Sequence, residues 1–131
     1  MTRLKVLIVE DHALNMELVL DVLEAAGYSV LQARDAERGM TLARAEKPQL
    51  VLMDVGLPGI DGLSATATLK SDPLTRSIPV VALTSHAMKG DRERILAAGC
   101  SGYITKPIDT RSLPLKVAEF IRQAGTEGGH A

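Results

Sequence analysis

The sequence predicts an α/β three-layer sandwich, in which a mostly parallel sheet is covered by helices on both faces. Five short apolar runs alternate along the chain with five segments of helical spacing, which is the pattern of strand–helix–strand units joined by right-handed crossovers. The central runs are continuously apolar, as expected for strands buried on both faces. A length of 131 residues with 46% hydrophobic content suits one domain with a single core.

Each predicted strand is a short run rich in Val, Ile and Leu, bounded by Gly, Pro or polar residues. The five runs are Leu4–Val9, Tyr28–Leu31, Leu50–Met53, Ile78–Leu83 and Gly102–Ile104.

The first predicted helix has apolar residues at i, i+3, i+4 and i+7 and ends at Gly27. These apolar residues are Met16, Val19, Leu20 and Leu23. The later helices span about Ala36–Glu46, Asp61–Lys70, Asp91–Ala98 and Thr110–Gln123. Pro114 fits the last helix only in its first turn, so a start nearer Ser112 is expected. We predict a domain over residues 1–124 and a flexible tail over residues 125–131, which are small and polar.

Composition argues against several classes of partner. The formal net charge of −1 leaves no surplus of the kind that nucleic acid or anionic lipid binding requires. No apolar run approaches the roughly 20 residues that cross a bilayer. One cysteine, Cys100, cannot form an intramolecular disulfide, and no signal peptide is evident, so a cytoplasmic location is expected. We interpret Cys100 as a packing residue, with a redox role as the open alternative.

Residues that can carry chemistry follow four of the five predicted strands. Ligands bind beyond the carboxyl ends of the strands in an open parallel sheet, so these residues are expected to share one site. Singly, each has a plainer role as a helix cap, a partner of loop amides or a solvated charge. They are Glu10 and Asp11 after the first strand, Asp54 after the third, Thr84 after the fourth, and Lys106 with Pro107 after the fifth.

Glu10, Asp11 and Asp54 together predict a metal site. Carboxylates held about 5 Å apart repel by about 3 kcal/mol per pair at an effective dielectric constant of 20. A cation is therefore expected, and Mg²⁺ suits carboxylate ligands with room for water and a phosphate oxygen.

Asp54 could then attack phosphorus and form an aspartyl phosphate. The Lys106 ammonium and the Thr84 hydroxyl would each meet a phosphoryl oxygen. A cis peptide bond between Lys106 and Pro107 would aim the ammonium at the site.

In these motifs the chain resembles the receiver (CheY-like) domains of bacterial two-component response regulators, over about Lys5 to Ile121. The spacings from Asp11 to Asp54, from Asp54 to Thr84 and from Asp54 to Lys106 are 43, 30 and 52 residues, as in that family. The stretch from His86 to Asp91 looks closest to single-domain regulators of the cell-division type. The matching motifs, in the family's order, are VLIVED (6–11), LMD (52–54), LPGIDG (57–62), ALT (82–84) and YITKP (103–107).

The resemblance implies a flavodoxin-like sheet of order 2-1-3-4-5 and a function in two-component signalling. Asp54 would accept a phosphoryl group from a histidine kinase or phosphotransfer protein in a Mg²⁺-dependent reaction, and the backbone carbonyl of Gly56 would be a further metal ligand. Such a protein catalyses only its own phosphorylation and dephosphorylation.

The resemblance also implies a switch. Phosphorylation would draw in Thr84 and let Tyr103 rotate inward, changing a face built from the fourth helix, fifth strand and fifth helix that binds a downstream protein. Residues 87–98 contain Gly90 and have a ragged apolar face, which is typical of low local stability. The plainer interpretation of Tyr103 is a half-buried aromatic with its hydroxyl in water.

Three positions are free to vary in this family or unusual for it. Gly56 carries no side chain over the phosphoryl group, and His86 lies two residues after Thr84, so we hypothesise that both tune the lifetime of the phosphoryl group. Pro114 lies in the presumed output face and bears on partner choice.

Three alternatives stay open. A phosphohydrolase resembling the haloacid dehalogenases would place its nucleophile after the first strand and an aspartate two residues later, whereas Asp54 follows the third strand and position 56 is glycine. A receiver-like scaffold that has lost the chemistry would not need to keep all five site residues, which are Glu10, Asp11, Asp54, Thr84 and Lys106. A receiver excised from a longer chain would keep the chemistry in another context.

Overall fold

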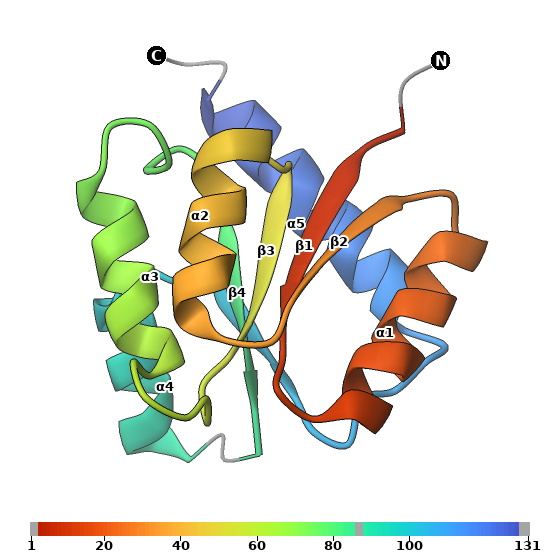
Figure 1. Cartoon of the computed structure of the whole chain (residues 1–131), viewed down its shortest axis with the longest axis horizontal. Coiled ribbons are helices and arrows are strands. Elements are labelled where there is room, and N and C mark those ends of the chain that lie inside the picture. The colour runs from red at the N-terminus through yellow and green to blue at the C-terminus, as the bar shows by residue number, and fades with distance from the viewer. Residues whose placement is uncertain (1–2, 86–87, 129–131) are drawn as a thin grey trace.

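A computed structural model describes residues 3–85 and 88–128, and these form a five-stranded parallel sheet between two layers of helices (Figure 1). The strand order is β2-β1-β3-β4-β5, which confirms the predicted topology. His86, to which we attributed a role in phosphoryl lifetime, and residues 129–131 of the predicted tail lie outside the described residues. The strands are β1 (Lys5–Val9), β2 (Ser29–Ala33), β3 (Leu50–Asp54), β4 (Val80–Thr84) and β5 (Gly102–Thr105).

The helices divide between the two faces of the sheet, with α2, α3 and α4 on one face and α1 and α5 on the other (Figure 1). In the described part of the chain, no helix is both long enough and apolar enough to cross a membrane. The helices are α1 (Ala13–Ala25), α2 (Ala36–Glu46), α3 (Gly62–Ser71), α4 (Lys89–Ala97) and α5 (Leu113–Gly128).

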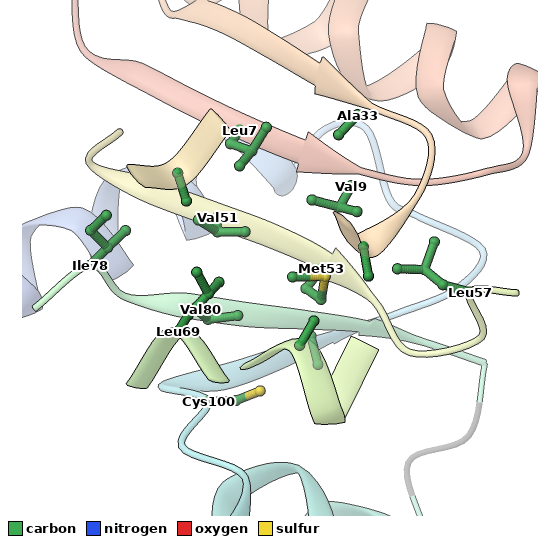
Figure 2. Packing of buried hydrophobic residues seen from close by; sticks show 14 of the residues in the cluster. Leu7, Val9, Ala33, Val51, Met53, Leu57, Leu69, Ile78, Val80 and Cys100 are labelled. Atoms are coloured by element: carbon green, nitrogen blue, oxygen red, sulfur yellow. The ribbon is translucent and has the colours of Figure 1, made fainter. Parts of the chain in front are cut away.

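Alternate residues of each central strand point into two separate core clusters. In β1, Leu7 and Val9 pack under α2 and α3, as seen in the close-up of that cluster (Figure 2), whereas Val6 and Ile8 pack on the other side of the sheet. All four side chains are fully buried, which explains why the strand sequences are continuously apolar. Cys100 belongs to the first cluster, in agreement with its interpretation as a packing residue, and burial raises the pKa of its thiol.

Most element boundaries differ from the sequence prediction by one or two residues; β2, for example, ends at Ala33 rather than Leu31. Strand β4 begins at Val80 rather than Ile78, because the amide of Ile78 donates to the carbonyl of Thr75 in a turn. Helix α4 begins at Lys89 rather than Asp91. Helix α5 begins at Leu113 with Pro114 in its first turn, as predicted, but continues to Gly128 instead of ending at Gln123. Residues 125–128 thus belong to a helix, and the domain boundary at residue 124 stays a prediction.

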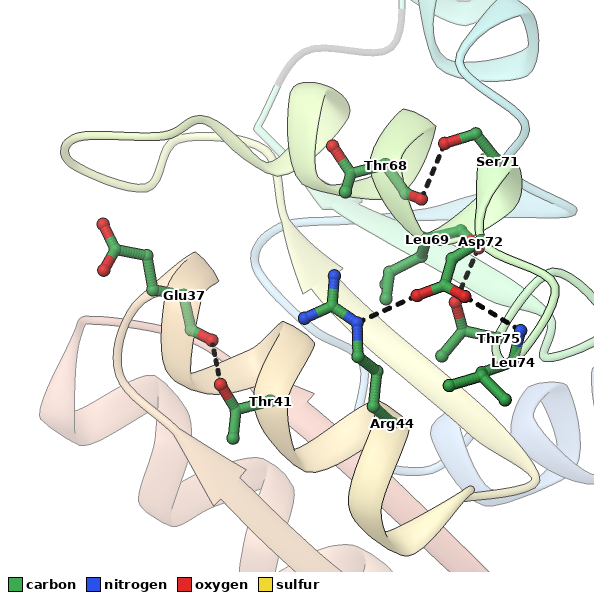
Figure 3. Close-up of polar contacts among 9 residues, drawn as sticks. All are labelled: Glu37, Thr41, Arg44, Thr68, Leu69, Ser71, Asp72, Leu74 and Thr75. Carbon is green, nitrogen blue, oxygen red and sulfur yellow. Dashed lines mark hydrogen bonds and ion pairs between the residues drawn. The ribbon is translucent and has the colours of Figure 1, made fainter.

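We call the side of the sheet where the strands begin the amino edge. Here the ends of α2 and α3 and the loop after α3 are joined by paired polar groups (Figure 3). Arg44 Nε lies 2.9 Å from Asp72 Oδ2, and Asp72 Oδ1 accepts a hydrogen bond from the amide of Leu74 at 2.9 Å. The buried hydroxyl of Thr75 donates to the carbonyl of Leu69 at 2.7 Å. Local hydrogen bonds therefore hold the loop in place.

Candidate functional site

A pocket of about 420 Å³ opens at the opposite side of the sheet, the carboxyl edge, where the strands end. It contains all the predicted phosphoacceptor, metal-ligand and phosphoryl-binding residues. Tyr103 does not line the pocket; it lies in β5, partly buried against the first core cluster. The lining residues are Glu10, Asp11, His12, Asn15, Asp54, Val55, Gly56, Thr84, Ser85 and Lys106.

The parallel register brings the strand ends to one level. The amide of Glu10 donates to the carbonyl of Ala33 and thus continues the β1–β2 pairing. Asp54 is the last residue of β3 and pairs with Leu83 of β4, while Thr84 is the last residue of β4. Asp54 and Thr84 end otherwise apolar strands and Glu10 directly follows β1, and Glu10, Asp54 and Thr84 are only 1%, 5% and 5% exposed.

Asp54 is held by two groups that both contact its Oδ1 atom. The amide of Gly56 donates a hydrogen bond at 3.0 Å, and Lys106 Nζ lies 3.2 Å away. The same ammonium lies 2.9 Å from Glu10 Oε1, and so it bridges the two buried carboxylates. The amide of Lys106 donates to the carbonyl of Thr84 at 2.8 Å, and the peptide bond between Lys106 and Pro107 is cis.

The three buried charges have opposed pKa shifts. Burial, together with the hydrogen bond and like charge of Asp54, raises the pKa of Glu10 above its ordinary value. Burial also acts to raise the pKa of Asp54, but the hydrogen bonds from Glu10 and Gly56 and the charge of Lys106 outweigh it and lower that pKa. Burial acts to lower the pKa of Lys106, and the two carboxylates outweigh it and raise that pKa. Lys106 and the amide of Gly56 therefore favour the ionised form of Asp54.

The carboxylates of Glu10, Asp11 and Asp54 suit a hard divalent cation. One oxygen from each lies within 4.8 Å of the others, and the Lys106 ammonium pairs with two of the three, Glu10 and Asp54. Glu10 Oε1 is fully buried, and within the described part of the chain the Lys106 ammonium is its partner. Oxygen ligands at this spacing, open to a water-accessible pocket, are compatible with Mg²⁺.

Two glycines shape the surroundings of Asp54. A Cβ atom at position 62 would collide with the backbone carbonyl oxygen of Asp54, so glycine lets α3 start directly against the end of β3. A Cβ atom at position 56 would lie 3.7 Å from Asp54 Oδ1, an ordinary contact distance. Gly56 is therefore not required by packing, and it leaves one side of Asp54 without a side chain.

The sequence analysis did not assign three polar lining residues: His12, Asn15 and Ser85. His12 directly follows Asp11, and Ser85 directly follows Thr84. Their positions next to predicted site residues indicated that they could line the site. Asn15 lies four residues after Asp11, in the first turn of α1. The spacing of four residues could have indicated Asn15 as a site residue, but only if a helix was expected to begin directly after Glu10 and Asp11.

Comparisons with known proteins agree with this geometry. Residues 6–118 match the model of the response regulator receiver domain family. The polar-differentiation response regulator DivK of Brucella anthropi is 50% identical over 103 residues, which cover 79% of this chain and 84% of that protein.

Solved structures of other receiver domains have the same fold as this chain. A CheY-like receiver domain protein from Methanospirillum hungatei superposes with a TM-score of 0.88 at 27% identity, covering 96% of this chain and 99% of that one. The receiver domain of the sensor histidine kinase PA1611 from Pseudomonas aeruginosa, which has a magnesium ion in its active-site cleft, gives a TM-score of 0.84 at 32% identity, covering 92% and 98%. With the family match spanning most of the sequence and the fold shared throughout, this chain belongs to the response regulator receiver domains of two-component signalling.

Proposed function

We propose that the protein accepts a phosphoryl group on Asp54 from a histidine kinase or a histidine phosphotransfer protein, and that the modified protein binds a downstream protein differently. The observation that carries this proposal is the environment of Asp54. Its carboxylate is buried at the end of β3, its pKa is lowered, and it faces the pocket beside Lys106 and Thr84. Acceptance by Asp54 accounts for the whole set of residues around it.

In the proposed transfer, an Asp54 oxygen forms a bond to phosphorus while the phosphorus–nitrogen bond of the donor phosphohistidine breaks. The electron pair of that bond returns to the imidazole, and the product is an aspartyl phosphate. Lys106 supplies positive charge to the phosphoryl oxygens, and Thr84 is near enough in the pocket to offer a hydroxyl. In this proposal the protein catalyses only its own phosphorylation and dephosphorylation.

Glu10, Asp11, Asp54 and the backbone carbonyl of Gly56 would hold Mg²⁺ in this proposal. When bound, the cation supplies positive charge that offsets the carboxylates and the incoming phosphoryl group. The magnesium ion of the PA1611 receiver domain supports this assignment by similarity.

Binding of the downstream protein would use the face formed by α4, β5 and α5, with Thr84 and Tyr103 as switch residues. In its support, α4 is thinly anchored: Ile95 is its one buried residue, and Met88 before it makes no side-chain cap hydrogen bond. A helix with so few buried contacts can shift at low energetic cost. Such signalling would take place in the cytoplasm.

Gly56 would set the lifetime of the aspartyl phosphate by leaving one side of it open. We expect Gly56→Asn to lengthen the half-life several-fold, because the new side chain would stand beside Asp54 at ordinary contact distance. The measurement is the decay of phosphorylated protein after the donor is removed. The control is Gln32→Asn, at an exposed position of β2 that does not line the pocket. Equal half-lives for Gly56→Asn and the wild type would refute the role of Gly56.

The experiment that tests phosphoacceptance is incubation with acetyl phosphate and Mg²⁺, followed by intact-mass measurement. The wild type should gain one phosphoryl group, and Asp54→Asn should gain none. A wild type that gains no mass, or an Asp54→Asn variant that gains the same mass, would overturn the proposal.

A further inference from the structure

We propose that the side-chain carbonyl of Asn15 is a positioning group for the bound cation, accepting a hydrogen bond from a metal-coordinated water. This inference rests on the proposed Mg²⁺ site. It assigns a role to a residue in the first turn of α1 that is neither a direct metal ligand nor a phosphoryl-binding group.

The first support is the placement of Asn15. It lines the pocket together with Asp11 and His12, which belong to the same connection between β1 and α1. The neighbouring Leu14 is 71% exposed, whereas Asn15 is partly buried, so the helix turns the amide rather than the leucine toward the pocket.

The second support is the absence of another partner for this amide. Among residues 3–85 and 88–128, no group forms a hydrogen bond with the Asn15 side chain. A partly buried amide without a protein partner is satisfied by water or by a polar ligand. The pocket is the polar surrounding that Asn15 faces.

The third support is the order of the strands, which distinguishes the two sides of Asp54. Strand β1 lies on one side of β3, and β4 and β5 lie on the other. Glu10, Asp11 and Asn15 all come from the β1 side, whereas Thr84 and Lys106 come from the β4–β5 side. Asn15 therefore belongs with the carboxylates that would hold the cation and not with the groups that would meet the phosphoryl oxygens.

The chemistry selects one atom of the amide. Mg²⁺ usually keeps several waters when carboxylates bind it. A water whose lone pair is directed at the cation can only donate hydrogen bonds, so its partner must be an acceptor. The Asn15 Oδ1 atom is such an acceptor, and groups that orient metal-bound ligands typically affect metal affinity tenfold or more.

The test is isothermal titration of the full chain with MgCl₂ at constant ionic strength, without any phosphodonor. Asn15→Ala should raise the dissociation constant for Mg²⁺ about tenfold. Asn15→Asp, which keeps the acceptor oxygen, should bind at least as tightly as the wild type. Leu14→Ala is the matched control in the same helical turn, and it should bind as the wild type does.

A thermal melt of each variant without Mg²⁺ separates binding from folding. Alanine favours helices more than asparagine, so Asn15→Ala should keep or raise the melting temperature of the metal-free protein. Equal Mg²⁺ affinity of Asn15→Ala and the wild type would overturn this inference alone, whatever the melting temperature of the metal-free variant. A wild type that binds no Mg²⁺ would overturn both this inference and the proposed metal site.

Discussion

The two edges of the sheet use polar residues in opposite ways. At the amino edge, the charge on Asp72 meets Arg44 and backbone amides, and the hydroxyl of Thr75 meets a carbonyl (Figure 3). At the carboxyl edge, three carboxylates crowd together, Lys106 pairs with Glu10 and Asp54, and the pKa values of these two carboxyl groups shift in opposite directions.

We expect the paired groups to stabilise the fold and the crowded groups to serve the proposed phosphoryl transfer. Paired groups at the amino edge add stability, whereas the crowded charges at the carboxyl edge reduce it in the absence of a cation. Substitutions at the two edges should therefore affect stability and phosphorylation separately, and the predictions below test this separation.

The largest expected effect on stability is at the amino edge. Thr75→Val should lower the free energy of unfolding by about 0.5–1.5 kcal/mol, because the buried carbonyl of Leu69 loses its shorter hydrogen bond and keeps the 3.4 Å one from the amide of Asp72. Thr41→Val is the matched control, since the Thr41 hydroxyl makes the same kind of bond to Glu37 on an exposed helix surface. It should change stability by less than about 0.5 kcal/mol.

Urea unfolding measures both free energies, and phosphorylation by acetyl phosphate should proceed at the wild-type rate in both variants. A Thr75→Val protein as stable as Thr41→Val would contradict the claim that paired polar groups at the amino edge stabilise the fold.

A smaller effect of opposite sign is expected at the carboxyl edge. Asp11→Asn removes one charge from the acidic cluster without removing a contact to Lys106, and should raise the melting temperature of the metal-free protein by about 4 °C. The variant should also lose most of the stabilisation that the wild type gains from Mg²⁺.

Asp21→Asn, at an exposed position of α1, the helix that follows Asp11, should change neither value. Metal-free Asp11→Asn that melts below the wild type would show that the acidic cluster does not oppose folding.

The smallest expected effect concerns pH at the amino edge. The hydrogen bond from the Leu74 amide and the pairing with Arg44 lower the pKa of Asp72 in the folded protein. Ionised Asp72 therefore contributes stability above the unfolded-state pKa, and this contribution is lost as the pH falls through the folded-state value. The wild type should melt slightly above Asp72→Asn near pH 7, and the difference should shrink as the pH is lowered below the unfolded-state pKa of about 3.9. A difference that persists in acid would mean that the charge of Asp72 is not its cause.

Much of this molecule could be predicted from its sequence, for a physical reason. Buried parallel strands must be apolar along their whole length, so the runs that became β1 and β3 stood out, and their ends located Glu10 and Asp54. The start of β4 was less predictable, because Ile78 is apolar but is bound in a turn with Thr75. The end of α5 was missed because its last residues include two glycines, which composition alone assigns to a tail.

Site residues at the ends of strands could be predicted from the sequence, whereas a site residue on the face of a helix could not. Asn15 escaped the sequence analysis because its role depends on how α1 rotates its first turn toward the pocket. The shared contact of Lys106 with Glu10 and Asp54 also depends on side-chain geometry that strand ends do not specify.

The most direct test of the central claim is to locate the phosphoryl group. After incubation with acetyl phosphate and Mg²⁺, borohydride reduces an aspartyl phosphate to homoserine, and peptide mass spectrometry identifies the altered position. The account predicts homoserine at position 54 alone, with the signal absent when Mg²⁺ is removed. Homoserine at position 11, a phosphoryl group on another residue type, or no modification would contradict the assignment of Asp54.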